Sequence, residues 1–236
     1  MRLMSVIVLI PAAGLGRRMG SSVHKQYLCL QGRPILSHTL SVFDRHPRVD
    51  HIYVIAPPDQ VDFCRQDIVE PGRFAKVRDI VAGGAERQDS VRLGLEACQA
   101  QADDIVLIHD GVRPLFDGGL LDGVLKAVEV HGSCVVGVPV KDTIKEVVEG
   151  FAVATPERKR LWAAQTPQAF RYSEILAGHR LAFEQNFYGT DDASLLEWQG
   201  KSVAMVEGSY RNIKITTPED LLIAEALLAG SKKGSK

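Results

Sequence analysis

Short apolar runs alternate with amphipathic segments of helical length along most of this 236-residue chain. The runs that predict strands cover residues 6–10, 51–56, 77–81, 105–108, 133–138 and 202–206. Segments with apolar residues on one helical face predict helices over 34–45, 59–69, 87–101, 117–130 and 172–185. Strands that alternate with helices favour a mainly parallel sheet covered on both faces. We therefore predict an α/β fold, a single Rossmann-like domain over residues 1–230.

The alternation breaks at residues 139–165, which are charged and contain short alternating pieces. The turn Glu149-Gly150 separates two of these pieces, a pattern that predicts a β-hairpin arm projecting from the sheet. An arm for oligomerisation and a plain surface excursion both remain open from the pattern. Thr217-Pro218 predicts the start of a C-terminal helix. The polar residues 231–236 are predicted to be a disordered tail.

The composition excludes several classes of protein. Arg and Lys number 28 and Asp and Glu 29, a net charge of −1 that argues against a general nucleic-acid binder. No apolar run approaches the roughly 18 residues that a membrane span needs. The four cysteines lie far apart without a C-x-x-C pair, and the N-terminus lacks a signal-peptide pattern. We expect free thiols and a cytoplasmic protein with no membrane or nucleic-acid partner.

The segment after the first predicted strand suits a polyphosphate. It combines small residues with Arg17, Arg18 and Lys25, and no Asp or Glu precedes Asp44. Small residues expose backbone N–H groups, and the cations add positive charge that no acid close in sequence offsets. A strand-to-helix turn that needs glycines only for its geometry is the alternative interpretation.

Two familiar phosphate-binding patterns do not match this segment. A P-loop requires G-x-x-x-x-G-K-[ST], and no glycine here begins that pattern. The spacing Gly14-x-Gly16-x-x-x-Gly20 is one residue longer than the dinucleotide fingerprint, and Asp44 comes too late to be its acid. An NAD-dependent dehydrogenase is therefore a weak alternative.

Two further clusters follow predicted strands, where ligands bind in doubly wound sheets. Gly83-Gly84 precedes Ser90, whose hydroxyl could contact a base or sugar or simply cap a helix. Asp110 is followed by Arg113 in the second cluster. Since Mg²⁺ needs only one or two carboxylates beside phosphate oxygens, Asp110 is the candidate ligand for Mg²⁺ or another divalent cation.

Several motifs, taken together and in order, resemble those of the 2-C-methyl-D-erythritol 4-phosphate cytidylyltransferases, a family of sugar-phosphate nucleotidyltransferases. The resemblance spans residues 5–228. The motifs are Pro11-Ala12-Ala13-Gly14, Arg18-Met19, Lys25-Gln26-Tyr27, Val138–Thr143, Leu161-Trp162, Gln165–Phe170, Thr190–Ser194 and Asn212–Leu221.

The resemblance implies transfer of CMP from CTP to methylerythritol phosphate, with release of pyrophosphate, in non-mevalonate isoprenoid synthesis. It implies nucleotide contacts by Ala12, Ala13, Gly14, Gly16, Arg18, Lys25, Gly84, Ser90, Asp110 and Gly111. It implies acceptor contacts by Asp110, Arg113, Thr143, Arg158, Thr190 and Lys214. The catalytic residues implied are Arg18, Lys25, Arg158 and Lys214, with Mg²⁺ at Asp110. It also implies a homodimer through the arm, because Thr143 and Arg158 lie on that arm.

The sequence departs from the family pattern in three places. Ala85 stands where some members have Asp, and Arg211 stands where an Asp often precedes the Asn-Ile-Lys motif. The family's common Asp-Ala-Ala-Arg-Pro is Asp110-Gly111-Val112-Arg113-Pro114 here, with a small residue still next to the Asp. The nearest alternative within the class is a ribitol-5-phosphate cytidylyltransferase. A nucleotide-binding module without enzymatic activity is a third possibility, which would bind CTP yet release no pyrophosphate.

Overall fold

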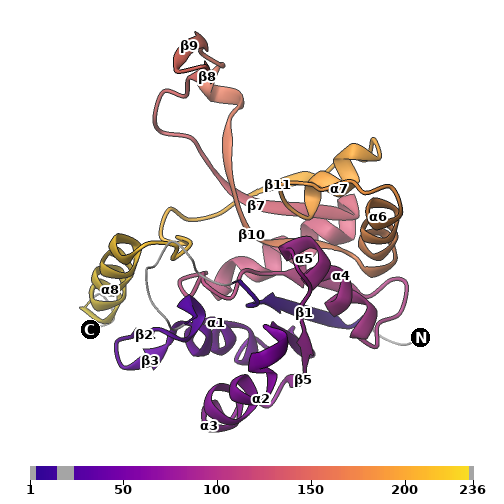
Figure 1. Ribbon diagram of the computed structural model, residues 1–236, viewed down its shortest axis with the longest axis vertical. Helices are drawn as coiled ribbons and strands as arrows, with labels where there is room; N and C mark the ends of the chain where they lie inside the picture. Colours follow the sequence, from indigo (N-terminus) through magenta and orange to yellow (C-terminus); the bar gives the residue numbers. More distant parts are fainter. Residues whose placement is uncertain (1–3, 15–23, 234–236) are drawn as a thin grey trace.

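In the described part of the chain, residues 4–14 and 24–233, the computed structural model contains a central seven-stranded sheet (Figure 1). Its strands lie in the order β11-β7-β10-β6-β1-β4-β5. Their bounds are β1 Val6–Pro11, β4 His51–Ala56, β5 Val77–Ala82, β6 Ile105–Ile108, β7 Ser133–Pro139, β10 Trp162–Arg171 and β11 Ala204–Glu207. Neighbouring strands are parallel, except that β10 runs antiparallel to both β6 and β7. The predicted mainly parallel sheet is confirmed.

Helices cover both faces of this sheet, as predicted. On one face, α1 (Ile35–Asp44) and α5 (Leu121–His131) pack over Val8 of β1. On the other face, α4 (Arg87–Ala97), α6 (Tyr172–Glu184) and α7 (Ala193–Trp198) pack over Leu9. Successive residues of a strand point to opposite faces, so the apolar run of β1 contributes to both cores.

Three parts of the predicted pattern were wrong or incomplete. The helix predicted over 59–69 is a series of short pieces, η3 Pro58–Gln60, α2 Val61–Phe63, η4 Cys64–Val69 and α3 Glu70–Gly72. The helix α7 was not predicted. The strand β10 was also missed, because its buried residues include Gln165, Thr166 and Gln168, which interrupt any apolar run. Its pairing with β7 shifts register between Ala164 and Gln168, beside the candidate site.

The predicted arm is a two-stranded antiparallel hairpin, β8 (Glu146–Val148) paired with β9 (Phe151–Ala154). Figure 1 shows it extending away from the sheet beyond the ends of β7 and β10. Every residue from 141 to 155 is exposed, and Phe151 has 77% of its surface accessible. The hairpin therefore gains no burial from the body of its own chain.

The hairpin β2 (Cys29–Leu30) with β3 (Arg33–Pro34) packs beside the C-terminal helix. The other short elements are η2 (Lys25–Tyr27) beside α1, η5 (Gly118–Leu120) directly before α5, and η6 (Arg158–Arg160) on the arm. The helix α8 runs over Pro218–Lys233, and its first turn is capped by Asp220, whose Oδ2 accepts from the N–H groups of Thr216 and Thr217. Helix thus occupies 231–233 of the predicted tail, and 234–236 lie outside the described residues.

None of the helices in the described ranges combines the length and the apolar character needed to cross a membrane.

Candidate active site

A pocket of about 410 Å³ opens beyond the carboxyl ends of β1, β5 and β6. This is the edge at which open α/β sheets bind ligands. Loops after these strands, the first turn of α4, and the segment before α8 supply its walls. The lining residues are Pro11, Ala12, Ala13, Gly14, Lys25, Gln26, Gly84, Ala85, Glu86, Arg87, Ser90, Asp110, Val112 and Lys214.

Close backbone packing shapes the wall that α4 contributes. A Cβ at Gly83 would lie 2.7 Å from the Cβ of Ala13, and one at Gly84 would lie 2.5 Å from the Cβ of Asp89. The N–H of Gly84 donates to Ser90 Oγ at 3.1 Å, and that hydroxyl donates to the carbonyl of Glu86 at 3.0 Å. Ser90 thus stabilises the turn, as one of the two interpretations predicts, and it also lines the pocket.

A second pocket, of about 260 Å³, adjoins the first and shares Arg87, Asp110 and Lys214 with it. Its other lining residues come from the loop after β6, from β10, and from the segment before α7. They are Arg113, Ala164, Gln165, Thr166, Gln168, Thr190 and Asp191. Two adjacent pockets that share one wall can hold two ligands in contact with each other.

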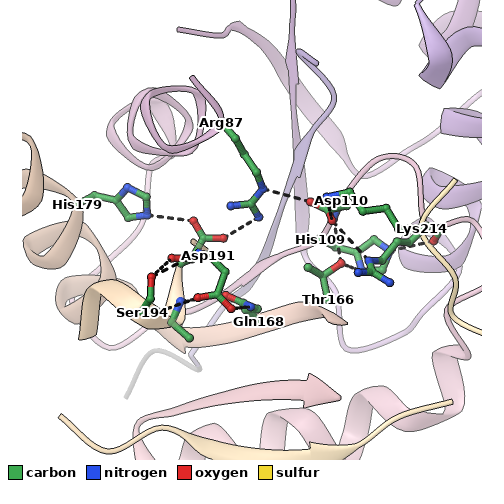
Figure 2. Close-up of polar contacts among 12 residues, drawn as sticks. Arg87, His109, Asp110, Thr166, Gln168, His179, Asp191, Ser194 and Lys214 are labelled. Carbon is green, nitrogen blue, oxygen red and sulfur yellow. Dashed lines mark hydrogen bonds and ion pairs between the residues drawn. The ribbon is translucent and has the colours of Figure 1, made fainter. Parts of the chain in front are cut away.

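Asp110 is the centre of the shared wall (Figure 2). Lys214 Nζ lies 2.9 Å from its Oδ2, Arg87 Nε lies 3.2 Å from its Oδ1, and Arg113 Nε lies 3.5 Å from Oδ2. Burial would raise the pKa of Asp110, but Arg87, Lys214 and Arg113 outweigh it and hold that pKa well below its ordinary value. The carboxylate is therefore ionised, and the cations around it exceed its single charge, which suits anionic ligands.

A directional chain of hydrogen bonds fixes the loop after β6. The Nε2 of His109 lies 3.0 Å from the carbonyl of Arg113, which can only accept, so this nitrogen carries the proton. Burial lowers the pKa of His109 to about 4, so its Nδ1 is an acceptor for the hydroxyl of Thr166 at 3.1 Å. The same hydroxyl oxygen accepts the N–H of Asp110 at 3.1 Å. Neutral His109 thus holds Asp110 against β10.

Lys214 is positioned by the buried Asn212. The Nδ2 of Asn212 donates to Gln165 Oε1 at 3.2 Å and to the carbonyl of Thr166 at 2.8 Å. The backbone carbonyl of Asn212 accepts from Arg113 Nη1 at 2.8 Å. These contacts hold the segment before α8 to β10, and Lys214 follows two residues later.

The residues that the sequence predicted for nucleotide contact lie mostly in the first pocket. Those that line it are Ala12, Ala13, Gly14, Lys25, Gly84, Ser90 and Asp110. Gly111 does not line this pocket. It packs closely against Ala12, and an added Cβ would lie 3.1 Å from the Cβ of that residue. Gly16 and Arg18 lie outside the described residues.

The residues predicted for acceptor contact are divided between two regions. Asp110, Arg113, Thr190 and Lys214 line the second pocket. Thr143 and Arg158 lie on the exposed arm and line neither pocket of their own chain. Arg158 Nη1 instead donates to the carbonyl of Lys141 at 2.8 Å.

Arg87 was missed as a site residue, although it lines both pockets. It joins Asp110 to the buried Asp192, with its Nη2 lying 2.8 Å from Asp192 Oδ2. The available signal was a cation in the first turn of a predicted helix, directly after Gly83-Gly84. Its partner Asp192 lies 105 residues away, so no local pattern joined the two.

The residues in the pocket fit a metal ion that arrives with a phosphate ligand. Asp110 supplies a single ionised carboxylate, and the described residues contain no cluster of His, Cys, Asp or Glu that would hold a metal on its own. A Mg²⁺ ion bound chiefly by phosphate oxygens needs no more than one or two such carboxylates.

A doubly covered, mainly parallel sheet with two adjoining pockets that share Arg87, Asp110 and Lys214 at its carboxyl edge suits a nucleotidyltransferase, which must hold a nucleotide beside an anionic acceptor. Residues 6–230 match the model of the 2-C-methyl-D-erythritol 4-phosphate cytidylyltransferase family. The chain belongs to this family.

Similar proteins from several bacteria agree with this assignment. The chain is 61% identical over 225 residues to 2-C-methyl-D-erythritol 4-phosphate cytidylyltransferase of Syntrophotalea carbinolica, covering 95% of this chain and 97% of that one. It is 54% identical to the protein of the same name from Geotalea uraniireducens, with 95% and 97% covered. The solved 4-diphosphocytidyl-2C-methyl-D-erythritol synthase of Anaerococcus prevotii superposes with a TM-score of 0.85 at 32% identity, covering 96% of both chains.

Proposed function

We propose that the enzyme transfers CMP from CTP to 2-C-methyl-D-erythritol 4-phosphate, giving 4-diphosphocytidyl-2-C-methyl-D-erythritol and pyrophosphate in non-mevalonate isoprenoid synthesis. The observation that carries this proposal is the shared wall of Asp110, Arg87 and Lys214 between the two pockets. CTP occupies the pocket lined by the loop after β1, and the acceptor occupies the pocket lined by Arg113 and Thr190. The names of the bacterial relatives support the choice of substrates.

The chemistry needs little acid–base help from the protein. An oxygen of the acceptor phosphate forms a bond to the α-phosphorus of CTP, and the bond from that phosphorus to the bridging oxygen breaks. The electron pair leaves with pyrophosphate. Because the nucleophile is already anionic at neutral pH, the barrier lies in bringing two anions together in line.

The cations of the site lower that barrier. Lys214, in the shared wall, neutralises the α-phosphate as the acceptor phosphate approaches it. Lys25, in the first pocket, and Arg18 hold the triphosphate and stabilise the charge that develops on pyrophosphate. Asp110 keeps Lys214 and Arg113 oriented toward the ligands through its ion pairs with both.

Mg²⁺ or another divalent cation, bound with CTP beside Asp110, would neutralise part of the triphosphate charge. The other predicted contacts with the nucleotide, at Gly16 and at the backbone of Gly111, remain part of this proposal.

The arm completes the acceptor pocket of a second subunit. Thr143 and Arg158 lie on the arm and line neither of the two pockets of their own subunit. The hairpin also exposes Val147, Phe151 and Val153, which are 56%, 77% and 56% accessible. An apolar hairpin of this kind is stabilised when a partner covers it, so we propose a homodimer through the arm.

We place the enzyme in the cytoplasm, without a membrane or nucleic-acid partner. Its four cysteines are free thiols, and three of them are buried, which suits a reducing compartment. The nearly balanced charge offers no general attraction to a polyanion.

The test is a substrate panel that measures pyrophosphate release with CTP and Mg²⁺. Methylerythritol 4-phosphate should support rapid release, whereas ribitol 5-phosphate should support little. Release with ribitol 5-phosphate alone would keep the fold and the phosphate chemistry but overturn the acceptor. CTP binding without release in either case would reduce the protein to a nucleotide-binding module.

A further inference from the structure

The loop over residues 187–194 carries Thr190 into the acceptor pocket, yet its attachments lead to the nucleotide pocket. Gln88, in the first turn of α4, contacts this loop at two points. Its Nε2 donates to the carbonyl of Phe187 at 2.8 Å, and its Oε1 accepts the N–H of Gly189 at 2.9 Å. One side chain thus fixes the backbone on the approach to Thr190.

Arg87 attaches the far end of the same loop. Its Nη2 lies 2.8 Å from Oδ2 of Asp192, which is 1% exposed, while its Nε lies 3.2 Å from Asp110. His179 of α6 lies 3.3 Å from the other oxygen of Asp192 (Figure 2). Burial would raise the pKa of Asp192, but Arg87 and His179 lower it to about 2, so this ion pair persists at neutral pH.

The remaining contacts join the loop to β10 and fold it closely on itself. Gln168 of β10 donates to Asp191 Oδ2 at 2.7 Å and accepts the N–H of Ala193 at 2.9 Å. A Cβ at Gly189 would collide with the hydroxyl of Ser194, which shows how closely the loop folds on itself. Displacement of its start at Gly189 is therefore transmitted to Thr190.

The first turn of α4 also belongs to the nucleotide pocket, since Gly84, Glu86, Arg87 and Ser90 line that pocket. A nucleotide bound there would contact this turn directly. Because Gln88 lies in the same turn, any restraint on the turn reaches the loop that carries Thr190 through the two hydrogen bonds of Gln88.

We propose that Gln88 and Arg87 form a brace, with Gln88 as a positioning residue that sets the acceptor loop and couples acceptor binding to CTP binding. The proposal rests on the function proposed above. By linkage, a nucleotide that strengthens acceptor binding through this brace is itself bound more tightly when the acceptor is present.

The direct test is Gln88→Ala, which removes both hydrogen bonds without touching either pocket. Losing two such bonds predicts a KM for the acceptor that rises about 5- to 10-fold. The kcat, and the Kd for CTP measured without acceptor, should stay within about twofold, because the loop contributes uniform binding of the acceptor and affects CTP only through the coupling. The matched control is Gln60→Ala, which removes a glutamine side chain whose Nε2 donates to the neighbouring Asp59.

Gln88→Glu separates the hydrogen bonds from side-chain size. It keeps an acceptor for Gly189 N–H but places a carboxylate oxygen against the carbonyl of Phe187. We expect an acceptor KM raised at least as much as in Gln88→Ala. Wild-type kinetics in Gln88→Glu, or a Kd for CTP without acceptor that weakens as much as the acceptor KM in Gln88→Ala, would overturn the proposal.

Amide hydrogen exchange tests the coupling without turnover. CTP with Mg²⁺, in the absence of acceptor, should slow exchange in residues 187–194 of the wild type and leave that exchange unchanged in Gln88→Ala. Equal protection of the loop in both proteins would overturn the brace. If the wild type released no pyrophosphate with any acceptor, the proposed function would fail instead, and the exchange result would still judge the coupling.

Discussion

The carboxyl edge of the sheet and the arm supply site residues under opposite physical conditions. At the sheet edge, Asp110 is 6% exposed and its loop is fixed by His109 and Thr166. On the arm, Thr143 and Arg158 are exposed, and so is every residue of the β8–β9 hairpin. Buried polar networks define one geometry, whereas an exposed hairpin acquires its geometry from a partner. In the proposed homodimer, the sheet edge of one subunit and the arm of the second would each supply part of the acceptor site.

The largest effect should come from the sheet edge. Lys25→Ala removes a preorganised charge from the nucleotide pocket and should lower kcat by about 10²-fold or more. Pyrophosphate release under saturating CTP measures this change. Lys126→Ala, at an exposed lysine of α5 that lies 3.7 Å from Glu129, is the control and should leave kcat unchanged. A near-normal kcat in Lys25→Ala would show that Lys25 is not a catalytic residue.

Mixing two inactive variants tests whether the arm acts in the partner's site. Arg158→Ala damages the arm and Lys214→Ala damages the sheet edge, so each homodimer should be nearly inactive. Random exchange makes half of the dimers mixed, each with one intact site, and activity should recover to about a quarter of the wild-type level.

The mixed sample should be assayed after joint refolding, with each variant refolded alone as its control. If the activity of the mixture stays at the mean of the two variants, Arg158 acts within its own subunit. The proposal that the arm completes the acceptor site of the partner subunit would then be wrong.

Asp192, at the buried end of the brace, should affect the stability of the fold more than the rate of CMP transfer. The depressed pKa of Asp192, about 2, means that its stabilising ion pair with Arg87 is fully present above the ordinary value of about 3.9 and is lost as pH falls toward 2. Asp192→Asn should therefore lower the free energy of unfolding by about 2 kcal/mol at pH 7.

Urea unfolding of wild type and variant at pH 7 and at pH 3 measures this loss. The difference between the two proteins should shrink at pH 3. A difference that is the same at both pH values would mean that the charge of Asp192 does not stabilise the fold.

The smallest effect is expected where the arm joins the sheet. The hydroxyl of Tyr210 donates to the carbonyl of Pro139 at 2.6 Å, and the ring lies under Lys141 Nζ. Tyr210→Phe removes only the hydrogen bond and should cost about 1 kcal/mol or less in unfolding free energy. Thermal unfolding and steady-state kinetics measure it. A large fall in kcat would instead show that the root of the arm controls the sheet-edge site.

Much of the fold could be predicted from the sequence, because β1, β4 and β6 are short apolar runs whose side chains are buried on both faces. The strand β10 could not be predicted, since Gln165 and Gln168 lie in it with partners far along the chain, at Ser209 and Asp191. Burial of such polar residues depends on tertiary partners, which a local pattern does not contain.

The candidate site likewise contains some residues that a local sequence pattern predicts and others that it does not. Lys25 and Asp110 could be predicted because each is a charged residue shortly after an apolar strand. Arg87 and Gln88 could not, because their roles depend on Asp192 and on the backbone at Phe187 and Gly189, about 100 residues away. Long-range positioning residues of this kind emerge only from the folded arrangement.

The most direct test of the account compares wild type with Lys214→Ala in one assay, measuring pyrophosphate release with CTP, Mg²⁺ and methylerythritol 4-phosphate. If the two pockets hold the two substrates against the shared wall, the wild type releases pyrophosphate and the variant is slower by about 10²-fold or more. Equal rates in the two proteins, or no release by the wild type, would contradict the claim that CMP transfer takes place between these pockets.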